Sequence, residues 1–327
     1  MISIRNNPLP DFKAENYLLL DPGLQKAVEV AIALNQPLLL TGEPGTGKTR
    51  LAHKIAYELA TYHKAHQFLP SPLVFNTKTT SSARDLFYTY DALGHFQDAN
   101  IKRSVGEESK TMADFIELQA FGKAIALSQP GQLKDIPVQL RLEGHEESGA
   151  DLPAYSSVVL IDEIDKAPRD FPNDILHEVE YRQFQIKEMG NAGIKYHPEQ
   201  RIVVIMTSNS EKNLPDAFLR RCIFYHIPFP THEQLKQIID AQLELRPNEN
   251  GKKLMDELID LFMQVRKQSV RKKPATAELI AWMRLLAVDG VFEAEKQQKG
   301  LDYLADYLSI IVKTKEDRDE ISKMLKV

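Results

Sequence analysis

The sequence has very little cysteine and no long hydrophobic run. Cys222 is the only cysteine, so an intramolecular disulfide is excluded and a reducing compartment is indicated. We interpret its thiol as a buried group in a strand rather than a reactive one. The longest apolar runs, such as 202–206, have the length of a strand and fall far short of a membrane span. We therefore expect a soluble cytoplasmic protein without membrane insertion.

An excess of positive charge and a secretory signal are also missing. The formal net charge is -5, which argues against a protein that coats nucleic acid, although a local basic patch remains compatible with it. Residues 1–12 contain no apolar core flanked by basic residues, so we expect no signal peptide. His63 and His66 have no acidic or cysteine companions at ligand spacing, which argues against a metal site there.

A glycine-rich segment, GEPGTGKT at 42–49, lies between the apolar run 37–40 and a segment of helical periodicity. Its pattern GxxxxGK[ST] is that of a phosphate-binding loop, whose backbone N–H groups point at phosphate oxygens. A glycine-rich turn with an exposed lysine is the plainer alternative. In a phosphate loop, Lys48 would bridge the β- and γ-phosphates of a bound nucleotide and the Thr49 hydroxyl would hold Mg²⁺. The predicted binding residues are Gly42, Glu43, Pro44, Gly45, Thr46, Gly47, Lys48 and Thr49.

A second motif, SVVLIDE at 157–163, combines consecutive apolar β-formers with two acids. Such a run describes a strand that is buried on both faces and delivers carboxylates at its end. We predict that Asp162 binds the nucleotide's Mg²⁺ and that Glu163 polarises an attacking water. A solvated acidic loop is the alternative, because Asp165 and Lys166 follow directly.

Strand and helix patterns alternate over the first 230 residues. A helix is predicted over 23–34 behind the N-cap Asp21. Further strands are predicted at 73–75, 202–206 and 222–227, and the region 79–135 is interpreted as a helical layer with a helix near 115–127. Two arms of alternating residues between 182 and 202 predict a hairpin, and the loop 144–151 shows no apolar period.

After Pro230 the sequence changes to helical periodicity alone. Apolar stripes recur at Leu258, Ile259, Phe262 and Val265, and again at Leu301, Leu304, Leu308 and Ile311. We therefore divide the chain into 1–230 and 231–327. The first part is predicted to be a three-layer α/β domain with a parallel sheet and a ligand at the carboxyl edge of its strands.

Four motifs together resemble those of AAA+ ATPases, and in particular of their MoxR-type branch. They are GEPGTGKT at 42–49, VVLIDEID at 158–165, MTSN at 206–209 and AFLRRC at 217–222. The resemblance covers about residues 15–325 and implies an α/β P-loop NTPase domain of the AAA+ type, followed by a small all-α lid domain. It also implies a homo-hexameric ring that binds ATP and Mg²⁺ between neighbouring subunits.

The resemblance assigns roles to three further residues. Asn209 matches the position that orients the lytic water together with Glu163, whereas a turn asparagine is the structural alternative. Arg221 matches the arginine that reaches the γ-phosphate of the next subunit, with Arg220 as a close competitor. A solvated arginine pair is the alternative for these two residues.

The chain departs from the family at the start of the predicted lid helix 276–283. Relatives place an arginine early in this helix to contact the γ-phosphate, and here the first turn has none. Arg271, Lys272 and Lys273 lie just upstream and Arg284 lies two turns in. Which of them serves, or whether none does, stays open at this stage.

The leading functional hypothesis is an ATP-fuelled machine that remodels or assembles partner proteins. Relatives of this type often work with a protein that contains a von Willebrand factor A domain, which is therefore the implied client class. The alternative is a nucleic-acid-dependent motor or loader, supported by the basic cluster RKQSVRKK at 266–273 but opposed by the acidic balance. A slowly hydrolysing assembly switch is a third hypothesis. The predicted hairpin could grip a client or simply face solvent.

Overall fold

The computed structural model describes residues 12–105, 110–136, 138–140, 142, 149–209, 214–243, 247–269, 271–294 and 300–325. The N-terminal residues 1–11 and most of the predicted loop 144–151 lie outside the described residues. The chain forms two compact units. The first unit comprises 1–20, 42–47 and 227–327, and the second comprises 21–41 and 48–226. The predicted division after residue 230 stays a prediction.

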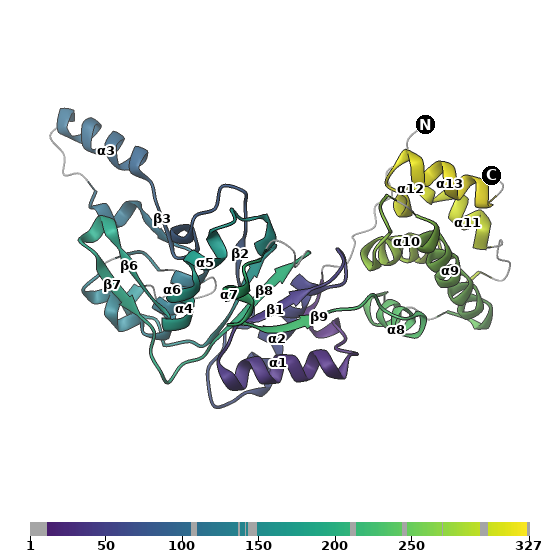
Figure 1. The fold of residues 1–327 in the computed structure, drawn as a ribbon, viewed down its shortest axis with the longest axis horizontal. Coiled ribbons are helices and arrows are strands. Elements are labelled where there is room, and N and C mark those ends of the chain that lie inside the picture. The colour runs from purple at the N-terminus through teal and green to yellow at the C-terminus, as the bar shows by residue number, and fades with distance from the viewer. Residues whose placement is uncertain are drawn as a thin grey trace. The chain divides into compact units, whose positions relative to one another are not determined.

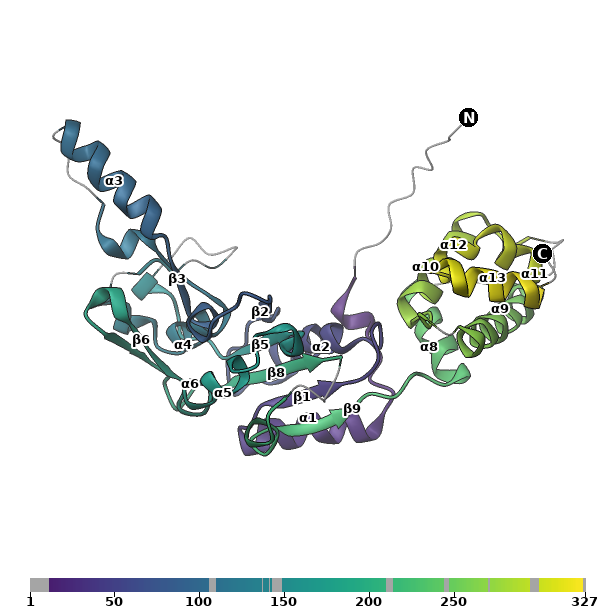
Figure 2. The ribbon, with the colours of Figure 1, turned by 45° about the horizontal axis from the view of Figure 1, so that its top comes forward.

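The second unit is built on a five-stranded sheet with the strand order β2-β5-β8-β1-β9 (Figures 1 and 2). Every neighbouring pair in this sheet is parallel, as predicted. The strands are β1 (Leu38–Thr41), β2 (Leu73–Asn76), β5 (Ser157–Asp162), β8 (Ile202–Ser208) and β9 (Ile223–His226). Because all five run in one direction, their carboxyl ends meet at one edge of the sheet.

Helices cover both faces of this sheet, which confirms the three-layer prediction. Leu39, Val159 and Met206 pack in one hydrophobic core with α4 (Ala120–Ser128). Their sequence neighbours Leu38 and Val158 point to the opposite face and are equally buried. On the sheet, α1 (Pro22–Leu34) contacts β1 and β9, and α2 (Lys48–Tyr62) contacts β5 and β8.

The start of α1 follows the predicted capping pattern. The Asp21 carboxylate accepts hydrogen bonds from the backbone N–H groups of Gly23, at 2.8 Å, and Leu24, at 3.4 Å. Pro22 is the first helical residue, where a proline costs no hydrogen bond. The helix ends at Leu34, and the next residue, Asn35, has φ 57° in the left-handed region.

Two small antiparallel sheets are attached to the second unit. The predicted hairpin is confirmed as β6 (Gln183–Ile186) and β7 (Ala192–Lys195). The other pair is β3 (Tyr88–Tyr90) with β4 (Ile116–Leu118). The helix α3 (Ala92–Val105) lies between these strands in the sequence and projects away from β3 (Figures 1 and 2). The predicted helix over 115–127 is therefore wrong in its first part, because residues 116–118 pair as a strand and the helix begins at Ala120. Short helices α5 (Phe171–Asp174), α6 (Leu176–Tyr181) and α7 (Asp216–Leu219) complete this unit.

The helical part of the first unit has its own hydrophobic core. Its helices are α8 (His232–Leu243), α9 (Glu249–Gln268), α10 (Thr276–Val288), α11 (Gly300–Asp306), α12 (Leu308–Ile311) and α13 (Lys315–Leu325). Leu258, Ile259, Phe262 and Val265 are buried in one core with Trp282, as their spacing predicts. The second predicted stripe is corrected in two respects: Leu301, in the first turn of α11, is 41% exposed, and the stripe is divided between the separate helices α11 and α12.

Across the described ranges, each helix is too short or too polar to cross a membrane.

Candidate functional site

The glycine-rich loop 42–49 has the backbone that its sequence predicts. Gly42, Gly45 and Gly47 all have positive φ, at 144°, 78° and 87°. Glycine adopts such values without the steric cost that a side chain adds. The Thr46 hydroxyl donates to the Glu43 carbonyl at 2.9 Å, which closes the turn. The segment thus curls in the manner of a phosphate-binding loop.

Lys48 and Thr49, the last two residues of this loop, also begin the first turn of α2. Lys48 is buried, and this burial lowers the pKa of its ammonium, although the carboxylates of Asp162, Asp165 and Glu163 act in the opposite direction. Burial removes part of the water around the ammonium, which strengthens its attraction to an anionic ligand. The start of a helix also presents backbone N–H groups and the positive end of the helix dipole.

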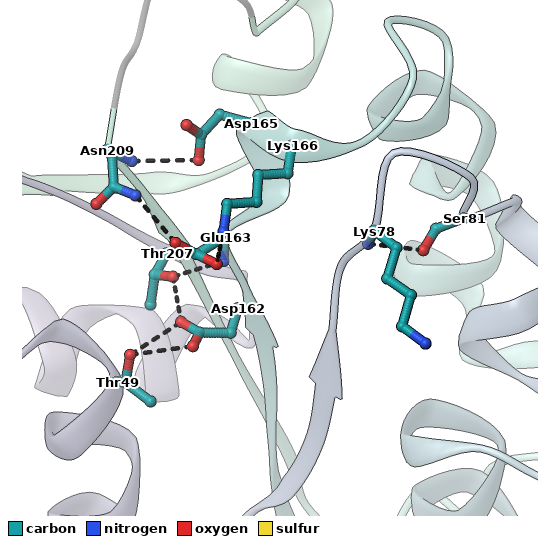
Figure 3. Close-up of polar contacts among 9 residues, drawn as sticks. All are labelled: Thr49, Lys78, Ser81, Asp162, Glu163, Asp165, Lys166, Thr207 and Asn209. Atoms are coloured by element: carbon teal, nitrogen blue, oxygen red, sulfur yellow. Dashed lines mark hydrogen bonds and ion pairs between the residues drawn. The ribbon is translucent and has the colours of Figure 1, made fainter. Parts of the chain in front are cut away.

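Asp162, at the carboxyl end of β5, is the centre of a chain of contacts (Figure 3). The Thr49 hydroxyl oxygen lies 3.0 and 3.1 Å from its two carboxylate oxygens. From the neighbouring strand β8, the Thr207 hydroxyl donates to Asp162 Oδ1 at 2.5 Å. The same hydroxyl accepts from the backbone N–H of Glu163 at 2.8 Å. Thr207 therefore fixes the two predicted acids relative to each other.

Glu163 leaves the strand in an unusual backbone conformation. Its φ of 55° lies in the left-handed region, which is uncommon for a non-glycine residue and is often found at functional sites. The side-chain amide of Asn209 donates to Glu163 Oε1 at 3.3 Å, and Lys166 forms an ion pair with Oε2. Asn209 itself is held by a hydrogen bond from its backbone N–H to Asp165, at 3.2 Å. Asn209 and Glu163 thus lie side by side, as Figure 3 shows.

The donor set fits a magnesium ion. Mg²⁺ prefers oxygen ligands and is usually held in proteins by one or two carboxylates together with substrate phosphates. The Thr49 hydroxyl and the Asp162 carboxylate are two oxygen donors that already face each other within hydrogen-bond distance. Lys78, which follows β2 at the same edge, points away from these contacts (Figure 3).

Arg220 and Arg221 do not join this group. They precede β9, so they lie beyond the amino end of the strands, whereas Asp162 and Asn209 lie at the carboxyl end. Both arginines are exposed and line a cavity of about 300 Å³ together with Pro37, which precedes β1. Arg221 donates to the Ala217 carbonyl at 3.1 Å and faces Glu180 at 3.7 Å. Within one chain they are remote from the acids.

Sequence reasoning missed two contributors to the site. Thr207 belongs to the MTSN motif, but no role was predicted for it, because the strand register that brings its hydroxyl to Asp162 is not encoded in a local sequence pattern. Lys166 was interpreted only as part of a charge run. Its position three residues after Glu163 is a spacing at which two side chains can form an ion pair, and this signal could have been used.

Comparison with known proteins gives a family for this arrangement. The model of the AAA domain, dynein-related subfamily, matches residues 37–222, more than half of the chain. The match includes the loop 42–49, both acids and Asn209. No curated protein matches the chain significantly.

Solved structures resemble the chain only distantly. The AAA domain of FIGL-1 in complex with ADP has 15% sequence identity and a TM-score of 0.45, with 93% of this chain and 87% of that chain covered. Domain III of the replication initiation protein DnaA from Thermotoga maritima has 14% identity and a TM-score of 0.44, with 94% and 100% covered. A mutant of RuvB from Thermotoga maritima has 16% identity and a TM-score of 0.37, with 88% and 75% covered.

Proposed function

Because the chain belongs to the AAA domain family, dynein-related subfamily, whose members are nucleotide-hydrolysing ATPases, we propose that it is a Mg²⁺-dependent ATPase of the MoxR type. In this proposal it works as a homo-hexameric ring that remodels or assembles a partner protein. A client with a von Willebrand factor A domain is the partner class that we propose.

One observation carries the proposal: Thr49, Asp162, Thr207, Glu163 and Asn209 form a continuous chain of contacts next to the end of the phosphate loop. Loop amides and Lys48 bind the ATP phosphates, and Thr49 and Asp162 hold Mg²⁺, which when bound neutralises phosphate charge. Glu163 accepts a proton from the attacking water, and Asn209 orients that water with its amide, which can donate and accept.

The variant Glu163→Gln tests this assignment. It keeps the side chain's size but removes the base, so we expect ATP to bind with an affinity near that of the wild type while turnover falls at least about a hundredfold. Binding is measured with a fluorescent ATP analogue and turnover by phosphate release. Glu29→Gln is the matched control, since Glu29 lies on the exposed surface of α1 and pairs only with α1 neighbours among the contacts observed. Near-normal turnover in Glu163→Gln would remove the base assignment.

The trapped complex also addresses the client. A subunit that binds ATP without hydrolysing it should retain its partner, so proteins that co-purify with Glu163→Gln and not with the wild type identify the client. The nucleic-acid alternative loses part of its sequence support, because Arg266 of the basic cluster is only 8% exposed and is paired within its own unit. Turnover that DNA or RNA stimulates, and that salt suppresses, would favour that alternative.

A further inference from the structure

Arg266 is a buried cation near the end of α9, and its observed contacts lie within the first unit. Its Nη2 forms an ion pair with Glu43 of the glycine-rich loop, and its Nη1 donates to the Pro274 carbonyl. The guanidinium carbon lies 3.5 Å from the centre of the Phe229 ring, a close cation-π contact. Three partners on three segments therefore fix this side chain in one position.

The loop residues 42–47 are also fitted closely to the rest of this unit. A Cβ atom on Gly45 would lie 2.4 Å from the Cβ of Ala275, just before α10, and one on Gly42 would lie 2.6 Å from the Ile227 carbonyl oxygen. Both distances are too short for any side chain. Ile227, Arg266 and Ala275 thus constrain the loop at three points, and the contact between Arg266 and Glu43 is an ion pair.

Glu43 places a carboxylate inside a motif that binds phosphates. Its side chain is 45% exposed, so an unpaired Glu43 would repel a triphosphate bound by the same loop. The Arg266 side chain is 10% exposed, and a buried charge is screened by salt much less than a surface charge. Pairing with Arg266 both cancels the charge of Glu43 and holds the side chain in place.

We propose that Arg266 is a positioning residue for nucleotide binding, which neutralises and orients Glu43 so that the phosphate loop accepts a triphosphate. The inference rests on the proposed ATPase function and adds a residue that contributes from α9. It also accounts for the absence of an arginine in the first turn of α10: here the link between lid and loop passes through Glu43 instead of reaching the phosphate directly.

The test compares Arg266→Met, Glu43→Gln and the double variant. We expect Arg266→Met to raise the Kd and KM for ATP about tenfold, which corresponds to about 1.4 kcal/mol, with a smaller rise for the less charged ADP and a much smaller change in kcat. Glu43→Gln should not weaken ATP binding, since it removes the very charge that Arg266 neutralises in the wild type. In the Glu43→Gln background, Arg266→Met should then weaken binding far less than tenfold.

Controls separate this role from a structural one. Lys267→Met removes a neighbouring exposed positive charge of α9 and should leave ATP affinity unchanged. Arg266→Lys keeps the charge and should retain most of the affinity. If Arg266→Met does not fold, Arg266→Gln, which is polar but uncharged, carries the same cycle. Wild-type affinity in Arg266→Met, or an equal loss with and without Glu43, would overturn the proposal. A wild-type protein that binds no ATP would instead overturn the proposed function.

Discussion

Thr207 is the residue on which the arrangement of both acids depends. Its hydroxyl donates to the Asp162 carboxylate and accepts from the Glu163 N–H, so one oxygen joins the metal-binding candidate to the base candidate. Thr207→Val preserves the shape of the side chain but leaves the Glu163 N–H without this partner. We expect ATP turnover to fall about tenfold or more, because a displaced base loses its alignment with the water. Steady-state phosphate release measures the loss.

Thr207→Ser is the matched control, since it retains the hydroxyl and should retain most of the activity. If Val and Ser variants hydrolyse ATP equally well, Thr207 has no part in holding the acids. A parallel thermal melt is needed, because an unpaired buried N–H lowers stability by about 1 to 3 kcal/mol.

Sequence motifs predicted the residues with a direct chemical role better than they predicted the residues that hold those side chains in place. Lys48, Thr49 and Asp162 carry patterns whose chemistry is local, and the structure brings Thr49 and Asp162 together. The function of Thr207 depends on the register in which Ile161 faces Met206, and no sequence pattern encodes that pairing. The contact between Glu43 and Arg266 joins residues 223 positions apart, which places it beyond any local pattern.

Helices and strands with a long apolar pattern or a capping residue were predicted well, and strands of only three residues were not. The strands β5 and β8 and the helix α1 matched their predicted ranges closely, because long apolar runs and an N-cap have few alternative interpretations. The pair β3 and β4 was missed, since three residues are too few for an alternating pattern to stand out in the sequence. Tertiary contacts stabilise this pair instead: Tyr88 donates to Glu188 next to the β6–β7 hairpin at 2.8 Å, and Phe184 of the hairpin stacks on Phe87 and Tyr88.

The cap of α1 gives a prediction about stability and its pH dependence. Asp21→Ala should lower the free energy of unfolding by about 1 kcal/mol, because two helix N–H groups lose their acceptor. Hydrogen bonds from Tyr225 and from the helix lower the pKa of Asp21 in the folded state. Because the pKa of Asp21 is lower in the folded state than in the unfolded state, the ionised carboxylate stabilises the fold at pH values above the unfolded-state pKa. This stabilisation is lost as the pH falls through the folded-state pKa.

The difference in the free energy of unfolding between wild type and Asp21→Ala should therefore be largest at neutral pH. It should shrink below about pH 4, near the ordinary carboxyl pKa. Urea unfolding at several pH values measures it. Asp21→Asn is the control, since an asparagine also caps helices and should lose less stability at neutral pH. A difference that stays constant down to about pH 3, below the ordinary carboxyl pKa, would contradict a role for the ionised carboxylate.

In the molecule as a whole, the proposed catalytic groups occupy opposite ends of one sheet. Asp162, Glu163 and Asn209 lie at the carboxyl end, and Arg220 and Arg221 precede β9 at the amino end. An arginine that cannot reach the site of its own chain can complete the site of a neighbour, and AAA+ proteins commonly assemble into rings. We therefore expect ATPase activity per subunit to rise with protein concentration until the assembly is complete.

Mixing two inactive variants tests the shared site directly. Lys48→Ala should lose phosphate binding, and Arg221→Ala should lose the group that stabilises the transferred phosphate, commonly worth about a thousandfold or more in rate. When the two are mixed equally and allowed to exchange, each Lys48→Ala subunit supplies Arg221 to the intact loop of an Arg221→Ala neighbour. Activity of about one quarter of the wild type should return, because about one interface in four combines both intact halves in a head-to-tail ring.

The same mixture made with Arg220→Ala decides between the two arginines. The arginine whose loss alone abolishes activity, and whose variant is rescued by mixing, acts in the neighbour's site. If neither mixture recovers activity although the subunits co-assemble, the arginines act within their own chain or not at all.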